Sequence, residues 1–120
     1  MGAPTDPPAP LRVILVCAAG MSSSLVETHL RQAAENAGLT LAVRSVSAFE
    51  MEHLETDAAA VRAILVAPQV RFLRRNLERR FGGLGITVLP IEPMDFGMAD
   101  GPAILAKLLA AIGRAPAGLG

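Results

Sequence analysis

Cys17 is the only cysteine of this chain, and its surroundings suit it to act as a nucleophile. It follows an apolar run directly and opens the stretch CAAGMSSSL, which contains small residues and serines but no charged side chain. A thiolate attacks an electrophilic centre far better than a thiol, and a helix that begins nearby favours the thiolate. The pattern therefore predicts a reactive thiol at the entrance of a polar turn.

The residues that follow Cys17 suit a cradle for a phosphoryl group. Backbone N–H groups at the start of a helix have no intrahelical partners and bind anions, while serine hydroxyls add donors and cap the helix. Glycine lets the chain adopt a positive φ and lets a ligand approach the backbone closely. The predicted phosphate-binding residues are Ala18, Ala19, Gly20, Met21, Ser22, Ser23, Ser24 and, from a second loop, Gln69. Gln69 either donates to phosphate oxygens or holds the loop that follows Pro68.

Several familiar motifs are missing from the cysteine turn, and their absence narrows the chemistry. The cysteine turn contains no GxxxxGK[ST] sequence, which would bind nucleotide phosphates, and no CxxC pair, which would exchange disulfides. A cysteine phosphatase of the C-x5-R type would have arginine where this chain has Ser23, so the predicted cradle lacks a bidentate cation. We therefore expect slow hydrolysis and a phosphoryl group kept until a partner removes it. The simpler alternative is that Cys17 is a small buried residue at a strand end.

Apolar runs and segments of helical periodicity alternate along the chain, which predicts alternating strands and helices. The predicted strands are residues 11–16, 39–46, 61–68 and 85–92. One predicted helix begins after Ser24, and two more cover residues 70–81 and 104–112. Residues 47–57 are expected to form a short acidic helix or a loop. Such an order predicts an α/β fold with a four-stranded parallel sheet, doubly wound in the order 2-1-3-4, with helices on both faces. Ligands of these sheets bind at the carboxyl ends of the strands where the winding reverses. We expect Cys17 and Gln69 to face each other across that crevice.

Composition and charge set the class of protein. The chain has 120 residues, 52% of them hydrophobic, a formal net charge of zero, four Phe and no Trp or Tyr. This predicts one globular domain over 11–113, between a proline-rich leader at 1–10 and a tail at 114–120, and argues against nucleic-acid binding. One cysteine forms no internal disulfide and no apolar run reaches membrane-spanning length, so we expect a cytoplasmic protein.

Three stretches of the sequence resemble a known family. ILVCAAGMSSSL resembles the signature of the enzyme IIB component, lactose/cellobiose type, of the bacterial phosphoenolpyruvate-dependent sugar phosphotransferase system. LVAPQVRF at 65–72 and MDFGMADG at 94–101 are similar to two further blocks of that family, in the same order. This chain has Ala18 where a serine is frequent and Phe96 where many members have tyrosine.

The resemblance implies a fold similar to low-molecular-weight tyrosine phosphatases and a phosphocysteine relay. Cys17 would accept a phosphoryl group from a phosphohistidine on a IIA protein and pass it to a sugar bound by the membrane-embedded IIC permease. No metal or organic cofactor is implied. Two alternatives remain open: a cysteine phosphatase or arsenate-reductase-like thiol enzyme, and a regulatory module without catalytic activity.

Charged residues away from the cysteine turn have less defined roles. The arginines of the predicted helix 70–81 form either a docking face for an acidic partner or an ordinary solvated face. These arginines are Arg71, Arg74, Arg75, Arg79 and Arg80. Asp95 and Asp100 follow the fourth strand and could line the crevice, although Asp100 suits the N-cap of the last helix better. We expect His29 to be packed or solvated, and Glu50, Glu52, Glu55 and Asp57 to be solvated rather than metal ligands.

Overall fold

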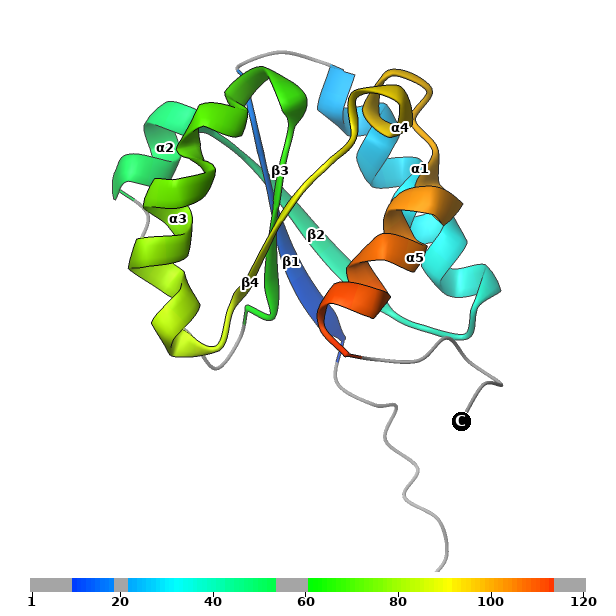
Figure 1. Cartoon of the computed structure of the whole chain (residues 1–120). Coiled ribbons are helices and arrows are strands. Elements are labelled where there is room, and N and C mark those ends of the chain that lie inside the picture. Colours follow the sequence, from blue (N-terminus) through cyan, green and yellow to red (C-terminus); the bar gives the residue numbers. More distant parts are fainter. Residues whose placement is uncertain (1–9, 19–21, 54–60, 114–120) are drawn as a thin grey trace, which may run out of the picture.

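The computed structural model describes residues 10–18, 22–53 and 61–113 of the chain (Figure 1). Its strands are β1 (Leu11–Cys17), β2 (Leu41–Ser47), β3 (Ala63–Val66) and β4 (Thr87–Pro90). Its helices are α1 (Ser22–Asn36), α2 (Ala48–His53), α3 (Arg74–Phe81), α4 (Pro93–Gly97) and α5 (Gly101–Ala111), with 3-10 helices η1 (Pro68–Leu73) and η2 (Gly82–Leu84). The predicted leader, apart from Pro10, and the tail lie outside the described residues.

The four strands form one parallel sheet in the order β2-β1-β3-β4, which confirms the predicted topology. The central strands β1 and β3 are buried almost throughout, because helices cover both faces of the sheet. This explains why both strands are nearly continuous apolar runs. At the carboxyl end of the sheet, Cys17 pairs in register with Ser47, and Val16 pairs with Val66.

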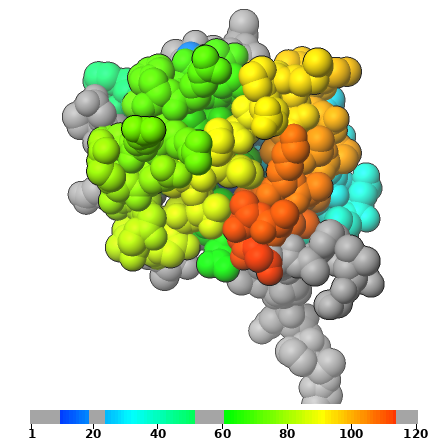
Figure 2. Space-filling view, viewed as in Figure 1, coloured from blue at the N-terminus to red at the C-terminus, as the bar shows by residue number. Residues whose placement is uncertain are grey.

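Helices cover the sheet from two sides (Figure 1). α1 and α5 pack together on one face, while α2 and α3 lie on the other. β4 is an edge strand whose four residues remain half-buried, and the space-filling view shows this part of the chain between α3 and α5 (Figure 2). The winding reverses between β1 and β3, so the predicted switch point is at the end of β1.

The boundaries of several elements differ from the sequence prediction. The third strand is Ala63–Val66 instead of 61–68, because Pro68 begins a 3-10 helix. The predicted helix 70–81 is divided into η1 and α3, and Val70 has a non-helical backbone (φ −122°, ψ 24°). The segment expected as a turn before the last helix contains α4, and α5 begins at Gly101, before the predicted start.

Within the ranges that the structure describes, every helix is too short or too polar to cross a membrane.

Candidate active site

Cys17 occupies the last position of β1, with strands on both sides of β1. Its side chain is buried, 7% exposed, and Sγ lies 3.8 Å from the carbonyl oxygen of Val46 in β2, to which the thiol donates. Burial against two strands fixes the position of the sulfur at the carboxyl edge of the sheet. The thiol therefore lies where a doubly wound fold binds its ligands.

Helix α1 begins at Ser22, only a few residues after Cys17. Its first turn contains the three serines, so the helix begins earlier than the predicted start after Ser24. The first turn of a helix directs N–H groups towards a bound anion. Ala18 is exposed beside the thiol. The predicted cradle residues Ala19, Gly20 and Met21 lie outside the described residues, as do the side chains of Ser22 and Ser23.

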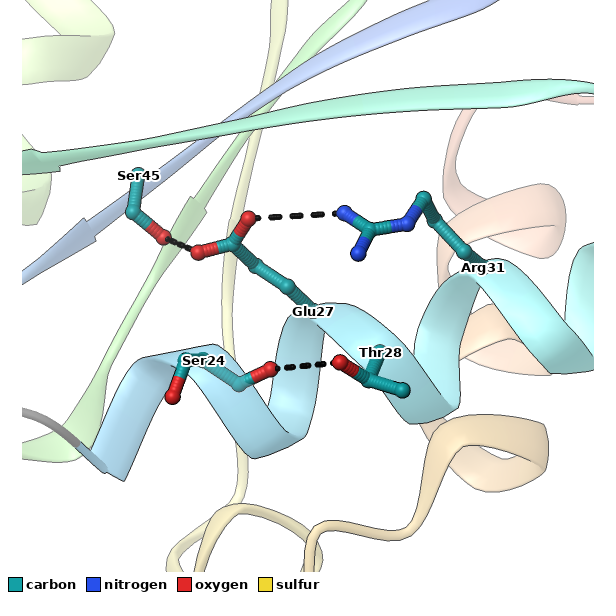
Figure 3. Close-up of polar contacts among 5 residues, drawn as sticks. All are labelled: Ser24, Glu27, Thr28, Arg31 and Ser45. Carbon is teal, nitrogen blue, oxygen red and sulfur yellow. Dashed lines mark hydrogen bonds and ion pairs between the residues drawn. The ribbon is translucent and has the colours of Figure 1, made fainter.

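A polar contact joins α1 to β2 close to the cysteine turn (Figure 3). The Ser45 hydroxyl donates to the Glu27 carboxylate, whose other oxygen lies 3.5 Å from Arg31 Nη1. One turn before Arg31, the Thr28 hydroxyl donates to the Ser24 carbonyl at 3.0 Å. The Ser45–Glu27 contact could not be predicted from the sequence, because the two residues belong to different elements and no local spacing links them. This contact fixes the first turns of α1 against the strand next to Cys17.

The segment after β3 approaches the same edge of the sheet. The Ala67 N–H donates to the Val16 carbonyl at 2.9 Å, which places the start of η1 beside the end of β1. Gln69 lies in η1 with an exposed side chain. Its predicted contact with phosphate remains a prediction, as do the roles of residues 18–24.

The start of α2 follows β2 at the same edge and is closed by a capping box. The Ser47 N–H donates to Glu50 Oε1 at 2.9 Å, and the Glu50 N–H donates to Ser47 Oγ at 3.1 Å. The hydrogen bond from the Ser47 backbone lowers the pKa of Glu50, and a side-chain hydrogen bond with Ser47 adds to this. The sequence SAFE contains the S-x-x-E signal of such a box, so this cap was visible in the sequence although it was not among the predicted features. Glu55 and Asp57 lie outside the described residues, as does the side chain of Glu52.

Residues of the block 94–101 have structural partners. Asp95 accepts a hydrogen bond from Lys107 of α5 at 2.6 Å, which raises the pKa of Lys107. Asp100 caps α5, as sequence analysis favoured, by accepting from the Ala103 N–H at 3.0 Å. His29, partly packed as expected, donates from Nδ1 to the Ala99 carbonyl at 2.8 Å. Phe96 is buried in the core.

The arginine-rich segment also has assigned contacts. Arg74 pairs with Glu78 at 3.3 Å. Arg80 donates to the Met51 carbonyl at 3.1 Å and lies 4.7 Å from the centre of the Phe81 ring. Nowhere in the part of the chain that the structure describes are three His, Cys, Asp or Glu side chains grouped so that they could hold a metal ion.

A buried thiol at the switch point of a four-stranded parallel sheet, a few residues before a serine-rich helix start, defines a small cysteine-centred α/β domain. The family model of the lactose/cellobiose-specific IIB subunit of the PTS system matches residues 12–107. The chain belongs to this family, as its cysteine motif indicated.

Sequence relatives agree with this assignment. The chain is 31% identical over 90 residues to the oligo-beta-mannoside-specific EIIB component of the PTS system of Bacillus subtilis (strain 168). The aligned region covers 75% of this chain and 84% of that protein. It is 27% identical over 96 residues to the cellobiose-specific EIIB component of Lactococcus lactis subsp. lactis (strain IL1403), and the aligned region covers 78% of this chain and 89% of that protein. The galactose-specific EIIB component of Lactococcus lactis subsp. cremoris (strain MG1363) matches equally, at 27% over 96 residues, 78% of this chain and 89% of that protein.

Solved structures share the fold. The lactose-specific IIB component domain from Streptococcus pneumoniae superposes with a TM-score of 0.71 at 19% identity, over 85% of this chain and 97% of that one. The cellobiose-specific phosphotransferase IIB component from Borrelia burgdorferi gives a TM-score of 0.67 at 23% identity, over 92% of this chain and 99% of that one. The predicted fold class is thereby confirmed.

Proposed function

We propose that this chain carries a phosphoryl group on Cys17 between a IIA protein and a sugar at a IIC permease. The observation that supports this most directly is the position of the single thiol. It lies at the carboxyl end of β1, a few residues before the first turn of α1. A nucleophile placed there meets both the ligand edge of the sheet and the positive end of a helix dipole.

The loading step is a phosphoryl transfer from nitrogen to sulfur. The Cys17 thiolate attacks the phosphorus of a phosphohistidine on the IIA protein, and an S–P bond forms. The N–P bond breaks, and its electron pair returns to the imidazole nitrogen. The thiol proton leaves before the attack, because only the thiolate is nucleophilic.

The cradle has to stabilise negative charge on the three phosphoryl oxygens in both the transition state and the phosphocysteine. We assign this to the backbone N–H groups of residues 18–24, with Ser22, Ser23, Ser24 and Gln69 as further donors. Ser23 stands at the position of a phosphatase arginine, so these donors are neutral. The resulting phosphocysteine lasts until an acceptor arrives.

The unloading step returns the thiolate. A sugar hydroxyl bound by the IIC permease attacks the phosphorus, an O–P bond forms, the S–P bond breaks, and the hydroxyl proton is released. We place both steps in the cytoplasm. The relatives are named for oligo-beta-mannoside, cellobiose and galactose, so their names point to a sugar substrate but to no single sugar.

The test is intact-mass analysis after incubation with phosphoenolpyruvate and relay proteins that include a IIA protein of the lactose/cellobiose type. We expect one added phosphoryl group on the wild type and none on Cys17→Ser. The same relay is first shown to load a known IIB component. Failure of the wild type to load, together with turnover of an aryl phosphate, would overturn the carrier function in favour of a thiol phosphatase.

A further inference from the structure

Large apolar side chains are exposed at the carboxyl end of the sheet. Phe72 in η1 is 74% exposed, Met94 in α4 is 71% exposed and Met98 directly after α4 is 70% exposed. Leu25, near the start of α1, is 54% exposed. These residues follow β3, β4 and β1, whose carboxyl ends share one edge of the parallel sheet. We call this set, Leu25, Phe72, Met94 and Met98, the apolar rim.

η1 and α4 meet across a shallow hollow, so two parts of the rim are neighbours. The hollow has a volume of about 170 Å³ and is lined by Pro68, Arg71, Pro90, Ile91, Glu92 and Pro93. Phe72 and Met94 directly follow two of these lining residues in the sequence. The space-filling view shows the segment after β3, in green, against the segment after β4, in yellow (Figure 2).

The other two members of the rim are brought together by the contact between His29 and Ala99. His29 Nδ1 donates to the Ala99 carbonyl, and Met98 is the preceding residue. Leu25 lies four residues before His29, one helical turn closer to the cysteine turn and on the same side of α1. The rim therefore runs from the start of α1 across α4 to η1.

Exposed apolar side chains grouped around a reactive centre mark an interaction surface more often than a solvated one. Methionine adapts its shape to a partner, and an exposed Phe supplies a rigid anchor. We propose that the apolar rim binds the phosphohistidine-bearing IIA protein through an apolar surface flanked by carboxylates. This inference rests on the proposed function, because it names the surface through which Cys17 is loaded.

The charges beside the rim favour the donor as its occupant. Arg71 and Arg75 are exposed, and among the described residues neither lies within salt-bridge distance of a carboxylate, whereas Arg74 pairs with Glu78. An incoming donor carries a phosphoryl dianion and is attracted by these two arginines. After transfer the dianion lies on this chain, so the attraction for the unloaded donor falls. The arrangement thus favours binding of the loaded donor and release of the spent one.

The first experiment measures the rate of Cys17 loading against the concentration of phosphorylated IIA protein. The variant is Phe72→Ala combined with Met94→Ala, and the control is Leu84→Ala, which removes a 54% exposed leucine in η2 before the amino end of β4. We expect about a tenfold rise in KM for the donor with kcat nearly unchanged, the loss typical of truncating interface anchors. The control should stay within about twofold of wild type. Because all three side chains are exposed, the variants keep the fold, which thermal melting verifies.

A second experiment isolates the charges. Arg71→Glu combined with Arg75→Glu should raise KM for the donor and weaken its dependence on salt, while Arg79→Glu, one turn further along α3, should do neither. Unchanged KM in both rim and charge variants, with a wild type that loads, would overturn this inference and leave the carrier function intact. Normal loading with slower transfer to the permease would assign the rim to the acceptor and also overturn it. A wild type that does not load would remove the proposed function itself.

Discussion

Gly101 packs directly against the backbone of His29. A Cβ placed on Gly101 would lie 2.2 Å from the His29 carbonyl oxygen and 2.5 Å from its carbonyl carbon. The first residue of α5 therefore touches the middle of α1 at a distance that only glycine permits. The same site includes the hydrogen bond from His29 to Ala99, so α4 and α5 are both fixed to the helix that follows the cysteine turn.

Gly101→Ala should destabilise the protein by about 2–3 kcal/mol, because α5 has to move away from α1 to admit the methyl group. Chemical unfolding followed by circular dichroism measures this change. Gly97→Ala is the matched control, since a Cβ on Gly97 meets nothing within 4 Å. In the helical segment α4 that substitution should be neutral or stabilise by about 0.5–1 kcal/mol. Equal effects of the two substitutions would contradict the close contact.

The sheet order could be predicted from the sequence because each central strand is a nearly continuous apolar run. LRVILV, apart from the exposed Arg12, and AILV are buried on both faces, and this separates them from the amphipathic helical segments. The position of Cys17 followed from the same reasoning, since a residue at the end of β1 must lie at the switch point. Element ends were less predictable: nothing in the pattern of apolar residues showed that η1 and α3 divide at Arg74.

Contacts between elements could not be read from local spacing. Ser45 and Glu27 meet only because β2 lies under α1, and the apolar rim exists only because three strand ends share one edge. The capping box of Ser47 and Glu50 is different, since its spacing is visible in the sequence. Asp100 was predictable as a cap for the same reason.

Removing the Ser45 hydroxyl tests the link between α1 and β2. Ser45→Ala should lower the free energy of unfolding by about 1.5 kcal/mol, because the partly buried Glu27 carboxylate loses a charge-assisted hydrogen bond. Urea denaturation gives the value. Combined with Glu27→Gln, the effect should be less than the sum of the single changes, as expected for residues in contact.

Arg31→Ala is the control for this pair, since the Arg31 side chain is 45% exposed and its ion pair with Glu27 lies on the helix surface. We expect a change of about 0.5 kcal/mol or less. If Ser45→Ala were no more harmful than Arg31→Ala, the Ser45–Glu27 hydrogen bond would not fix α1 to the sheet.

The capping box should make stability depend on pH. Hydrogen bonds from Ser47 lower the pKa of Glu50 from its ordinary value of 4.5, so the folded state favours the carboxylate. The stabilisation from Glu50 is therefore present above pH 4.5 and is lost as the pH falls through the lowered pKa. The melting temperatures of wild type and Glu50→Gln, measured as a function of pH across this range, should differ near neutral pH and converge in acid. A constant difference in acid would contradict this linkage.

Asp100 should stabilise α5 through its side-chain oxygen. Asp100→Ala removes the acceptor of the Ala103 N–H, and we expect the free energy of unfolding to fall by about 1 kcal/mol. Asp100→Asn keeps an oxygen in the same place and should restore most of the stability, which excludes a loss of charge as the cause. Because Asp100 also lies between Ala99 and Gly101, the alanine variant should loosen the contact with His29, and amide exchange of α5 should accelerate more than that of α3. Equal destabilisation by alanine and asparagine would show that the carboxylate charge, and not the cap, is what stabilises this end of α5.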